Sequence, residues 1–456
     1  MPRPPRPTHF DTLLEPGYGP SRRALLGGGL ALALPLLFPR AAAARQGGTA
    51  PRTLRVGLVG CGGRGTGAAW QAMHAEAGSV VLWAMGDVFA DRLEGSRAYL
   101  EGALAEEGSS ARMDVPEERR FAGFESFKRV IDSGVDIVLL TALPAFRPAH
   151  LAYAVEKGCH VFCEKPMAVD VPGIRRVEAA AEAARAKNLS LVSGYCWRYN
   201  VRHRELFARI HDGAIGDVQT VYTNYFAGPL ATRPRQEGWS DVEWMLRNWH
   251  HFRAFSGDHL VEQAIHSVDK QSWALRDRPP VRAISVGGCQ TRSGTEKGDT
   301  FDHFAVVYEY EGGARAFCNA RQWPNSYGEN NDFIYGTKGR AIIENWAPHH
   351  RIEPYGEGSA WEYEGEGNDM YQTELDELVV SIRAGEPIND GTWMARSNLL
   401  GILGRDAAYT GRAITWEEIL NSERRLGPPG IEDGVLDFGA LAHSFDEPVP
   451  GTYSFL

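Results

Sequence analysis

A lysine stands where an apolar run of the chain ends. His160-Val161-Phe162-Cys163 has the length of a buried strand, and Glu164-Lys165-Pro166 follows it directly. Ligands of α/β proteins bind beyond the carboxyl ends of the strands. There a lysine can hydrogen-bond a substrate hydroxyl and lower the pKa of that hydroxyl. Lys165 is therefore a candidate catalytic residue, the alternative being a solvated charge at a strand end. Pro166 restrains the preceding residues and allows a cis peptide bond.

Four ionisable side chains recur at helical spacing further along the chain. After Gly257 the pattern predicts a helix on which His259, Glu262, His266 and Asp269 share one face, at spacings of 3, 4 and 3 residues. On such a helix Glu262 would orient His266, and His266 would remove a proton from a hydroxyl group. Two alternatives are a zinc site, although H-E-x-x-H is missing, and a solvated or packed helix face.

Aromatic and hydrogen-bonding side chains alternate in two segments. Tyr195-Cys196-Trp197-Arg198-Tyr199-Asn200 follows a predicted strand, and Arg247-Asn248-Trp249-His250 precedes the helix with the ionisable stripe. This mixture suits a sugar, because aromatic rings stack on its CH faces while donors meet its hydroxyls. The alternatives are a helix start packed on the core and a plain loop. The candidate substrate-binding residues are Arg147, Tyr195, Arg198, Arg247, Asn248, Trp249 and Asp269.

A glycine-rich turn between a strand and a helix is typical of dinucleotide binding. The apolar run 54–59 is followed by Gly60-Cys61-Gly62-Gly63-Arg64-Gly65 and then by a predicted helix over 68–76. Gly60 permits the tight turn, Gly62 lets the backbone approach a diphosphate, and Gly65 lets the helix pack closely on the strand. The helix N-terminus would face the phosphates.

A second apolar run, 80–85, ends at Gly86-Asp87. An acidic side chain at this position accepts hydrogen bonds from the adenosine ribose and repels a 2′-phosphate. We therefore favour NAD over NADP, although Arg64 and Arg92 could offset the carboxylate. The alternative role of Asp87 is that of a helix N-cap.

Strands and helices alternate up to residue 194, which predicts an α/β fold with a doubly wound parallel sheet. Further strands are expected at 135–140, 160–163 and 190–194, with helices at 126–133, 150–157 and 171–187. The candidate cofactor-binding residues at the strand ends are Gly60, Gly62, Gly63, Arg64, Gly65, Asp87, Thr141, Leu143, Pro144, Glu164 and Lys165. The second half predicts a sheet with strands at 218–226, 282–290, 301–310, 314–321, 332–335 and 340–344, followed by helices at 370–384 and 395–410.

The composition is that of a globular protein of more than one domain. The chain has 456 residues, 43% of them hydrophobic, and a formal net charge of −10. An acidic chain without a basic cluster is a poor nucleic-acid ligand. The six cysteines include no C-x-x-C pair, so neither a disulfide scaffold nor a thiolate zinc site is indicated, and no metal is expected.

The first 44 residues are expected to be an export signal. Arg22-Arg23 precedes an apolar run that ends near Phe38, and Ala41 to Ala44 would form a cleavage site. The run is shorter than a membrane span, and the paired arginines resemble a twin-arginine signal, which directs folded proteins to the periplasm. An uncleaved anchor is the alternative. After signal removal we expect no membrane association. The expected divisions are a signal at 1–44, a linker at 45–53, a dinucleotide-binding domain at 54–194, a substrate domain at 195–425 and a tail at 426–456.

The glycine turn, Glu164-Lys165-Pro166 and Glu262-x-x-x-His266 together resemble the Gfo/Idh/MocA oxidoreductase family over residues 54–415. The resemblance implies a Rossmann domain followed by an α/β domain with a large open, mainly antiparallel sheet. It also implies that Lys165 and His266 are the motif lysine and histidine. The family usually has Asp four residues before this histidine, where the chain has Glu262. Glucose–fructose oxidoreductase, a member with a similar export signal, retains its cofactor and uses NADP.

These observations predict an exported NAD(P)-dependent oxidoreductase that acts on a hydroxyl of a sugar, cyclitol or glycoside, with a tightly retained cofactor. His266 would take the hydroxyl proton, Lys165 would polarise the oxygen, and Glu262 would orient His266. One alternative is a glycosidase that oxidises its substrate transiently and eliminates the glycosidic bond, without net formation of NADH. Another is a sugar-binding protein without activity. An open sheet face also favours a homodimer or homotetramer.

Overall fold

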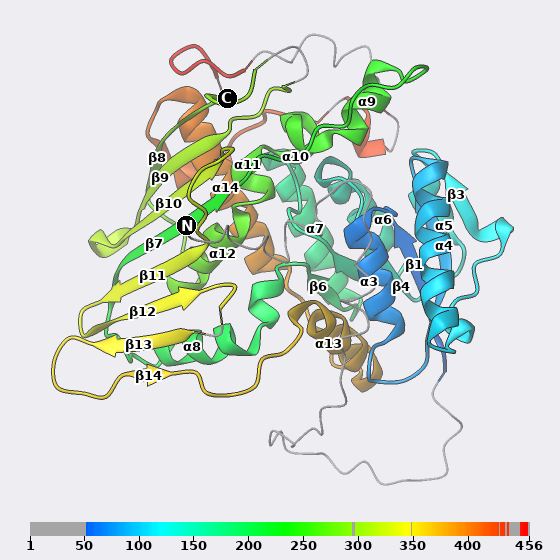
Figure 1. Ribbon diagram of the computed structural model, residues 1–456, viewed down its shortest axis with the longest axis horizontal. Helices are drawn as coiled ribbons and strands as arrows, with labels where there is room; N and C mark the ends of the chain where they lie inside the picture. Colours follow the sequence, from blue (N-terminus) through cyan, green and yellow to red (C-terminus); the bar gives the residue numbers. More distant parts are fainter. Residues whose placement is uncertain are drawn as a thin grey trace, which may run out of the picture.

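The computed structural model describes residues 52–293, 297–347, 349–427, 429–433, 436 and 447–454. Figure 1 shows two sheets, one in each half of the chain, with helices packed between and around them. The expected export signal, residues 1–44, lies outside the described residues. Within the described part, no helix is both long and apolar enough to cross a membrane.

Six parallel strands form the first sheet, in the order β3-β2-β1-β4-β5-β6. The chain runs outward from β1 to β3 and then returns to place β4 on the other side of β1, which creates the reversal in strand order where α/β proteins bind ligands. The predicted doubly wound parallel sheet is confirmed. Its strands are β1 (Leu54–Val59), β2 (Val80–Asp87), β3 (Arg120–Ala122), β4 (Ile137–Leu140), β5 (His160–Cys163) and β6 (Leu191–Ser193).

Helices cover both faces of this sheet because its strands are apolar on both sides. Val56 and Leu58 of β1 pack in a cluster with α3, α4 and α13, whereas Val59 packs in the cluster beneath α5, α6 and α7. Helix α13 comes from the second half of the chain and packs on α3. The bounds are α3 (Gly63–Met73), α4 (Ala90–Glu106), α5 (Ser126–Asp132), α6 (Arg147–Glu156), α7 (Val171–Ala186) and α13 (Met370–Ala384).

The second sheet has nine strands in the order β14-β13-β12-β11-β7-β10-β9-β8-β15. Only the pair of β7 and β10 is parallel among these described strands, which confirms the mainly antiparallel sheet. The strands are β7 (Val218–Ala227), β8 (Arg282–Gly288), β9 (His303–Glu309), β10 (Arg315–Gln322), β11 (Asn331–Gly336), β12 (Gly339–Glu344), β13 (His350–Pro354), β14 (Trp361–Glu362) and β15 (Ile414–Thr415).

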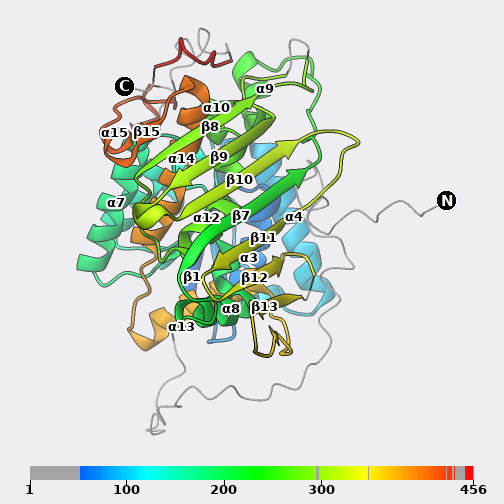
Figure 2. The ribbon, with the colours of Figure 1, turned by 90° about the vertical axis from the view of Figure 1, so that its left-hand side faces the viewer.

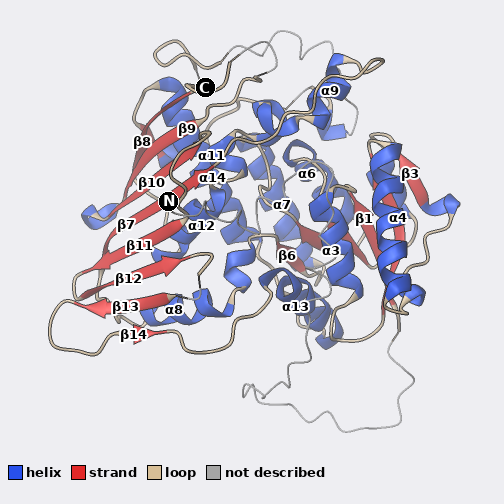
Figure 3. Cartoon of the chain, in the orientation of Figure 1, coloured by secondary structure: helices blue, strands red, loops and turns tan. Residues whose placement is uncertain are grey.

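Helices lie on the side of the second sheet that is turned toward the first domain (Figure 3). On β9, Phe304, Val306 and Tyr308 point into that core and are buried, whereas the alternating Ala305 and Val307 are partly exposed. Figure 2 shows the strands in front of these helices, so the described elements leave the outer face of the sheet open. The remaining helices are α8 (Val201–His211), α9 (Asp241–Arg247), α10 (Arg253–Ser256), α11 (His259–Glu262), α12 (Ile265–Ala274), α14 (Gly391–Thr410) and α15 (Trp416–Leu420).

Candidate active site

The glycine turn after β1 leaves open space beside the start of α3. Gly60 has a φ of +99°, and a Cβ placed on it would lie 2.4 Å from the Ala142 backbone nitrogen. A Cβ on Gly65 would lie 1.9 Å from the Gly60 oxygen, so the close packing of α3 on β1 requires glycine. Around Gly62, in contrast, no heavy atom would lie within 4 Å of a Cβ. The turn therefore has the room that a diphosphate needs at a helix N-terminus.

Asp87, at the end of β2, connects the glycine turn to the start of α4. Its carboxylate accepts hydrogen bonds from the backbone nitrogens of Cys61 at 2.7 Å and Phe89 at 2.9 Å. Burial raises the pKa of Asp87, and these hydrogen bonds and Arg92 oppose that effect. Asp87 is not the N-cap of α4, because that position is Phe89 and no side chain caps the helix. The contact of Asp87 with an adenosine ribose stays a prediction. The residues present fit an adenosine ribose and diphosphate.

The end of β4 forms the neighbouring wall of the glycine turn. Thr141 donates from Oγ1 to the Gly60 carbonyl oxygen at 2.7 Å. Leu143 then precedes a short 3₁₀ turn, Pro144–Phe146. The candidate cofactor-binding residues that follow β1 and β4 are therefore neighbours in space, as the order of the strands in the sheet requires.

The guanidinium of Arg64 forms ion pairs with carboxylates of the protein. Its Nε donates to Glu164 Oε1 at 2.6 Å and its Nη2 pairs with Glu374 of α13. Two candidate cofactor contacts, Arg64 and Glu164, are therefore joined to each other. The sequence suggested that Arg64 could offset Asp87 toward NADP, but its charge is compensated by the buried carboxylates.

Lys165 lies between β5 and the second domain. Its peptide bond to Pro166 is cis, and its Nζ donates to Glu262 at both the backbone oxygen, at 2.6 Å, and Oε1, at 3.2 Å. Burial acts to raise the pKa of Glu262, but Lys165 and then His250 outweigh burial and lower it. The motif lysine therefore meets the helical segment that carries the ionisable stripe.

His266 belongs to the same group of side chains. It is 3% exposed, its Nδ1 has no hydrogen-bond partner, and the edge of the Tyr195 ring faces it with centroids 6.3 Å apart. Burial, followed by the charges of Lys165 and Lys270, lowers the pKa of His266 well below its usual range. The imidazole is therefore neutral, and the lone pair of a neutral ring nitrogen is what a base needs to take up a proton.

The single helix expected after Gly257 is divided into α11 and α12. The Ala264 backbone nitrogen donates to the His259 oxygen, five residues earlier, so the backbone leaves the helical register between the two helices. As a result, the four residues of the stripe have different surroundings. Glu262 pairs with Lys165 and does not form the hydrogen bond expected to orient His266, whose Nδ1 has no partner. Both ring nitrogens of His259 are buried and lack a hydrogen-bond partner.

Two candidate substrate-binding residues form an ion pair with each other. Arg198 donates from Nη2 to Asp269 Oδ1 at 2.8 Å and to Asp277 Oδ1 at 2.6 Å, and its guanidinium lies 4.1 Å from the centre of the Trp393 ring. Asp269 is 1% exposed. These charges therefore hold α12 in place and are compensated within the protein.

The Arg247-Asn248-Trp249-His250 segment divides its side chains between two regions. Arg247 forms two hydrogen bonds with Asp91 of α4, each of 2.9 Å, and the Asn248 side chain bonds the backbone of Arg233 at 2.7 Å. His250 stacks on Trp249 at 3.7 Å, and burial lowers its pKa to about 4 despite Glu262. Sequence reasoning named its three neighbours as ligand contacts but missed His250, which is close enough to Glu262 to help lower the pKa of that carboxyl.

Arg147, the remaining candidate contact, is 4% exposed and donates from Nη1 to the Pro166 oxygen at 2.5 Å, while its Nε lacks a partner. It therefore supports the Lys165–Pro166 segment.

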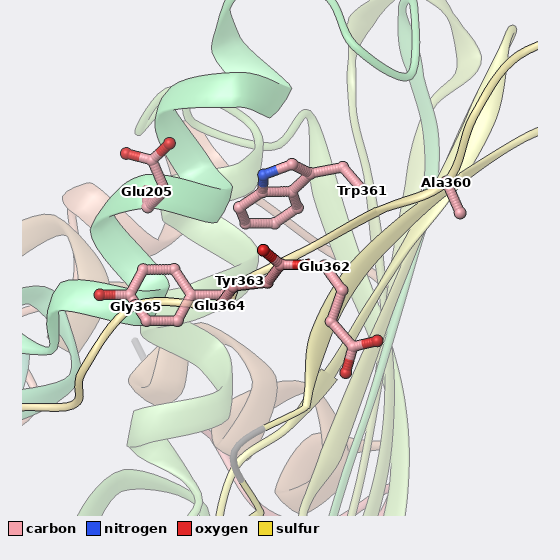
Figure 4. Close-up of a pocket in the computed structure, with 7 residues that line it drawn as sticks. All are labelled: Glu205, Ala360, Trp361, Glu362, Tyr363, Glu364 and Gly365. Carbon is pink, nitrogen blue, oxygen red and sulfur yellow. The ribbon is translucent and has the colours of Figure 1, made fainter.

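A separate surface pocket of about 370 Å³ lies at the edge of the second sheet. Glu205 of α8 and the segment 360–365 line it, with Trp361 and Tyr363 beside several carboxylates (Figure 4). None of the candidate site residues lines this pocket. Among the described residues, no group of three or more His, Cys, Asp or Glu could hold a metal ion.

Two family models match the chain. The model described as "Oxidoreductase family, NAD-binding Rossmann fold" matches residues 54–193, and the one described as "GFO/IDH/MocA C-terminal domain" matches residues 203–342. The chain belongs to the Gfo/Idh/MocA oxidoreductase family. Its first domain is therefore a Rossmann domain of the NAD-binding type.

Curated relatives include inositol dehydrogenases. The chain is 26% identical to inositol 2-dehydrogenase 3 of Saccharopolyspora erythraea over 267 residues, which are 58% of this chain and 65% of that protein. It is 21% identical to myo-inositol 2-dehydrogenase of Thermotoga maritima over 378 residues, 80% of this chain and 100% of that protein. The first of these matches thus spans less than two thirds of the relative's length.

Solved structures of the same fold include aldose–aldose oxidoreductase from Caulobacter crescentus complexed with glycerol. That structure superposes with a TM-score of 0.62 at 23% identity, and the match covers 80% of this chain and all of the other. At this level of identity the similarity establishes the fold.

Proposed function

We propose that the protein transfers a hydride between a hydroxyl-bearing carbon of a sugar, cyclitol or glycoside and a nicotinamide dinucleotide. The observation that carries the proposal is the meeting of Lys165 and the His266 segment at the carboxyl end of β5, on the same sheet edge as the open glycine turn. The curated inositol dehydrogenases and the aldose–aldose oxidoreductase support a polyol substrate.

The residues of the chain have separable tasks in this reaction. Gly60, Gly62 and Gly65 would hold the diphosphate, and Asp87 would accept hydrogen bonds from the adenosine ribose, which favours NAD. The bound dinucleotide supplies the hydride acceptor. His266, neutral and buried, accepts the hydroxyl proton, and Lys165 donates a hydrogen bond to the same oxygen. Glu262 holds the ammonium of Lys165 in place through the contact of 3.2 Å.

A second candidate function is a glycosidase that oxidises its substrate transiently. Elimination next to a newly formed carbonyl requires a second proton acceptor, and His250 provides a second neutral imidazole close to Glu262 and Lys165. The placement of His250 suits such a step, and we therefore keep this alternative. The third possibility is a binding protein without activity. Such a function does not explain why Lys165 is paired with Glu262.

Label transfer separates the three functions. The purified protein would be incubated with a polyol deuterated at its carbinol carbons, such as perdeuterated myo-inositol, and with a deuterated aryl glycoside. A dehydrogenase moves deuterium to the nicotinamide and forms net NADH. A redox-cycling glycosidase releases the phenol without net NADH. Absence of any transfer to cofactor across a sugar and cyclitol panel would refute both catalytic functions.

We also propose that the protein is exported by the twin-arginine route and retains its cofactor, because residues 1–44 carry Arg22-Arg23 and a short apolar run. The mature chain would begin near Ala44 or Arg45. N-terminal sequencing of protein from the periplasmic fraction tests this, and an intact residue 1 on exported protein would contradict it. Release of NAD or NADP from purified protein on denaturation tests the retention.

A homodimer formed through the outer face of the second sheet is the assembly we propose. Val286 is 68% exposed and Ile284 is 39% exposed on that face, next to the partly exposed Ala305 and Val307. Apolar side chains on an open sheet face favour burial against a second copy.

A further inference from the structure

A chain of buried polar groups begins one helical turn after His266. Lys270 of α12 is 1% exposed, its ammonium forms an ion pair with Asp332 of β11, and it donates to Asn345 Oδ1 at 2.7 Å. The same ammonium lies 5.2 Å from the centre of the Trp197 ring. Lysine is seldom buried this completely, and here every donor contact of its ammonium is made inside the protein.

The chain continues across the core of the second domain. Asn345 donates from Nδ2 to Asp332 Oδ2 at 2.9 Å, and its Oδ1 lies 3.1 Å from Nε2 of His203 on α8. His203 Nδ1 lies in turn 3.1 Å from Nε2 of His350 on β13. The network therefore ties α12 to α8 and to β11 and β13 of the sheet against which these helices pack (Figure 1).

Stability alone does not account for this arrangement. Removing two opposite charges from water costs several kcal/mol per ion, and buried ion pairs can often be replaced by apolar residues without loss of stability. The pair is also incompletely satisfied, because Asp332 Oδ1 is buried without a hydrogen-bond partner. A charge that is held in the core at such a cost points to a role for the charge itself.

The position of the charge relative to His266 suggests that role. Residues four apart on a helix have Cβ atoms about 5–6 Å apart, so Lys270 follows His266 along one side of α12. The other ionisable groups around the imidazole are Lys165, whose charge is opposed by Glu262, and Tyr195, which presents a ring edge. On α12 itself, Asp269 is neutralised by Arg198. Lys270 therefore places a positive charge on α12, the helix that carries His266, and its counter-ion, Asp332, lies on β11.

We propose that Lys270, held by Asp332 and Asn345, is a positioning residue that keeps His266 in its neutral, proton-accepting form. A positive charge next to the imidazole opposes a second positive charge on the ring, so it favours the unprotonated ring when no substrate is bound. The inference rests on the proposed function of His266 as the base. It adds that the base is controlled from the core of the second domain as well as from Lys165.

The test is a titration of the His266 imidazole in the full chain, by NMR of protein labelled at histidine ¹³Cε1, with His266→Gln assigning the signal. Two unit charges about 8 Å apart at an effective dielectric constant of about 20 shift a pKa by about 1.5 units, and Asp332 offsets part of this. We therefore expect Lys270→Met to raise the pKa of His266 by about one unit or more. Lys270→Arg keeps the charge and should leave it low, and Asp332→Asn should not raise it.

The signs of these shifts distinguish a charge effect from a packing effect. Lys270→Gln, which can still donate to Asn345, replaces the Met variant if that variant does not fold. Lys157→Met, at an exposed lysine of the first domain, is the matched control and should not move the signal. The proposal is overturned if Lys270→Met and Lys270→Gln leave the His266 titration unchanged, or if Asp332→Asn raises it as much as they do.

Failure of the proposed function would look different. In that case the His266 signal would shift as expected in the Lys270 variants, while His266→Gln would retain full hydride transfer to NAD with the polyol panel. If hydride transfer depends on His266 but the pKa of His266 is the same in the Lys270 variants, only the proposed role of Lys270 is refuted. In the favourable case, the acidic limb of kcat/KM moves upward in Lys270→Met together with the NMR titration.

Discussion

Substitution of Arg64 by Met tests how the glycine turn is supported. In the structure this guanidinium joins α3 to Glu164, after β5, and to Glu374 of α13, with side-chain exposures of 29%, 7% and 0% for the three residues. Met keeps the length of the aliphatic stem but leaves two buried carboxylates without their cation. The loss therefore includes the cost of the uncompensated charges as well as the lost hydrogen bonds.

The magnitude follows from the burial of the partners. Removing one member of a buried ion pair costs about 3–5 kcal/mol, and the partial exposure of Arg64 places the expected loss near the lower end, at about 3 kcal/mol. For a protein with domains of this size, such a loss lowers Tm by about 6–12 °C. Burial raises the pKa of Glu374 well above its usual range. Once Arg64 is gone, the buried carboxyl of Glu374 is tolerated better when protonated, so the loss should be smaller at pH 5 than at pH 8.

Thermal and urea unfolding followed by circular dichroism measure this loss. Arg64→Met with Glu374→Gln removes one orphaned carboxylate and should recover part of the stability. Arg97→Met, on the exposed side of α4, is the matched control and should change the free energy of unfolding by less than about 1 kcal/mol. A loss below about 1 kcal/mol in Arg64→Met, or a double variant no more stable than the single one, would refute the reasoning.

Three further outcomes are expected. His150 is buried between Phe127 and Phe146, and burial and then Arg147 lower its pKa from 6.5 to about 3. The unfolded chain binds a proton at this residue below pH 6.5 and the folded chain does not, so lowering the pH from 8 to 5 should cost about 2 kcal/mol of stability. In denaturant titrations, His150→Phe should lose this acid sensitivity. Arg247→Met removes both hydrogen bonds that join this residue to Asp91 of α4, and we expect it to increase the rate at which fluorescent NADH leaves the protein by tenfold or more. An unchanged rate would show that this contact does not slow the release of the cofactor. Val286→Glu should convert the proposed dimer to a monomer in light scattering, whereas a dimer that persists would place the interface elsewhere.

Local patterns were sufficient to predict the frame of the site. The order of an apolar run, glycines and a helix predicted β1, the turn and α3. This was possible because the tight turn and the close packing of the helix require glycine at fixed positions, which can be read from the sequence. The open space at Gly62 and the contact of Gly65 with Gly60 meet those demands. Lys165 was found because a strand end in a parallel sheet defines where a ligand lies.

Contacts between distant segments could not be predicted in the same way. Nothing in the Arg64 segment indicates that Glu374, 310 residues later, would be its partner, since α13 reaches the first domain only through the packing of the whole chain. The break between α11 and α12 depends on a shift of one backbone hydrogen bond, which a helical pattern does not reveal. For that reason the expected pairing of Glu262 with His266 was replaced by Glu262 with Lys165, and His250 was missed.

The most direct test of the central claim, that Lys165 and His266 act together on one substrate oxygen, is a single-turnover measurement of NADH formation in the presence of an oxidisable polyol. His266→Ala should slow the absorbance rise at least about a hundredfold while the protein binds NAD as before, and Lys165→Met should slow it comparably. Combining the two substitutions should then add far less than the product of the single effects. Near-normal hydride transfer in His266→Ala, with cofactor bound, would contradict the account.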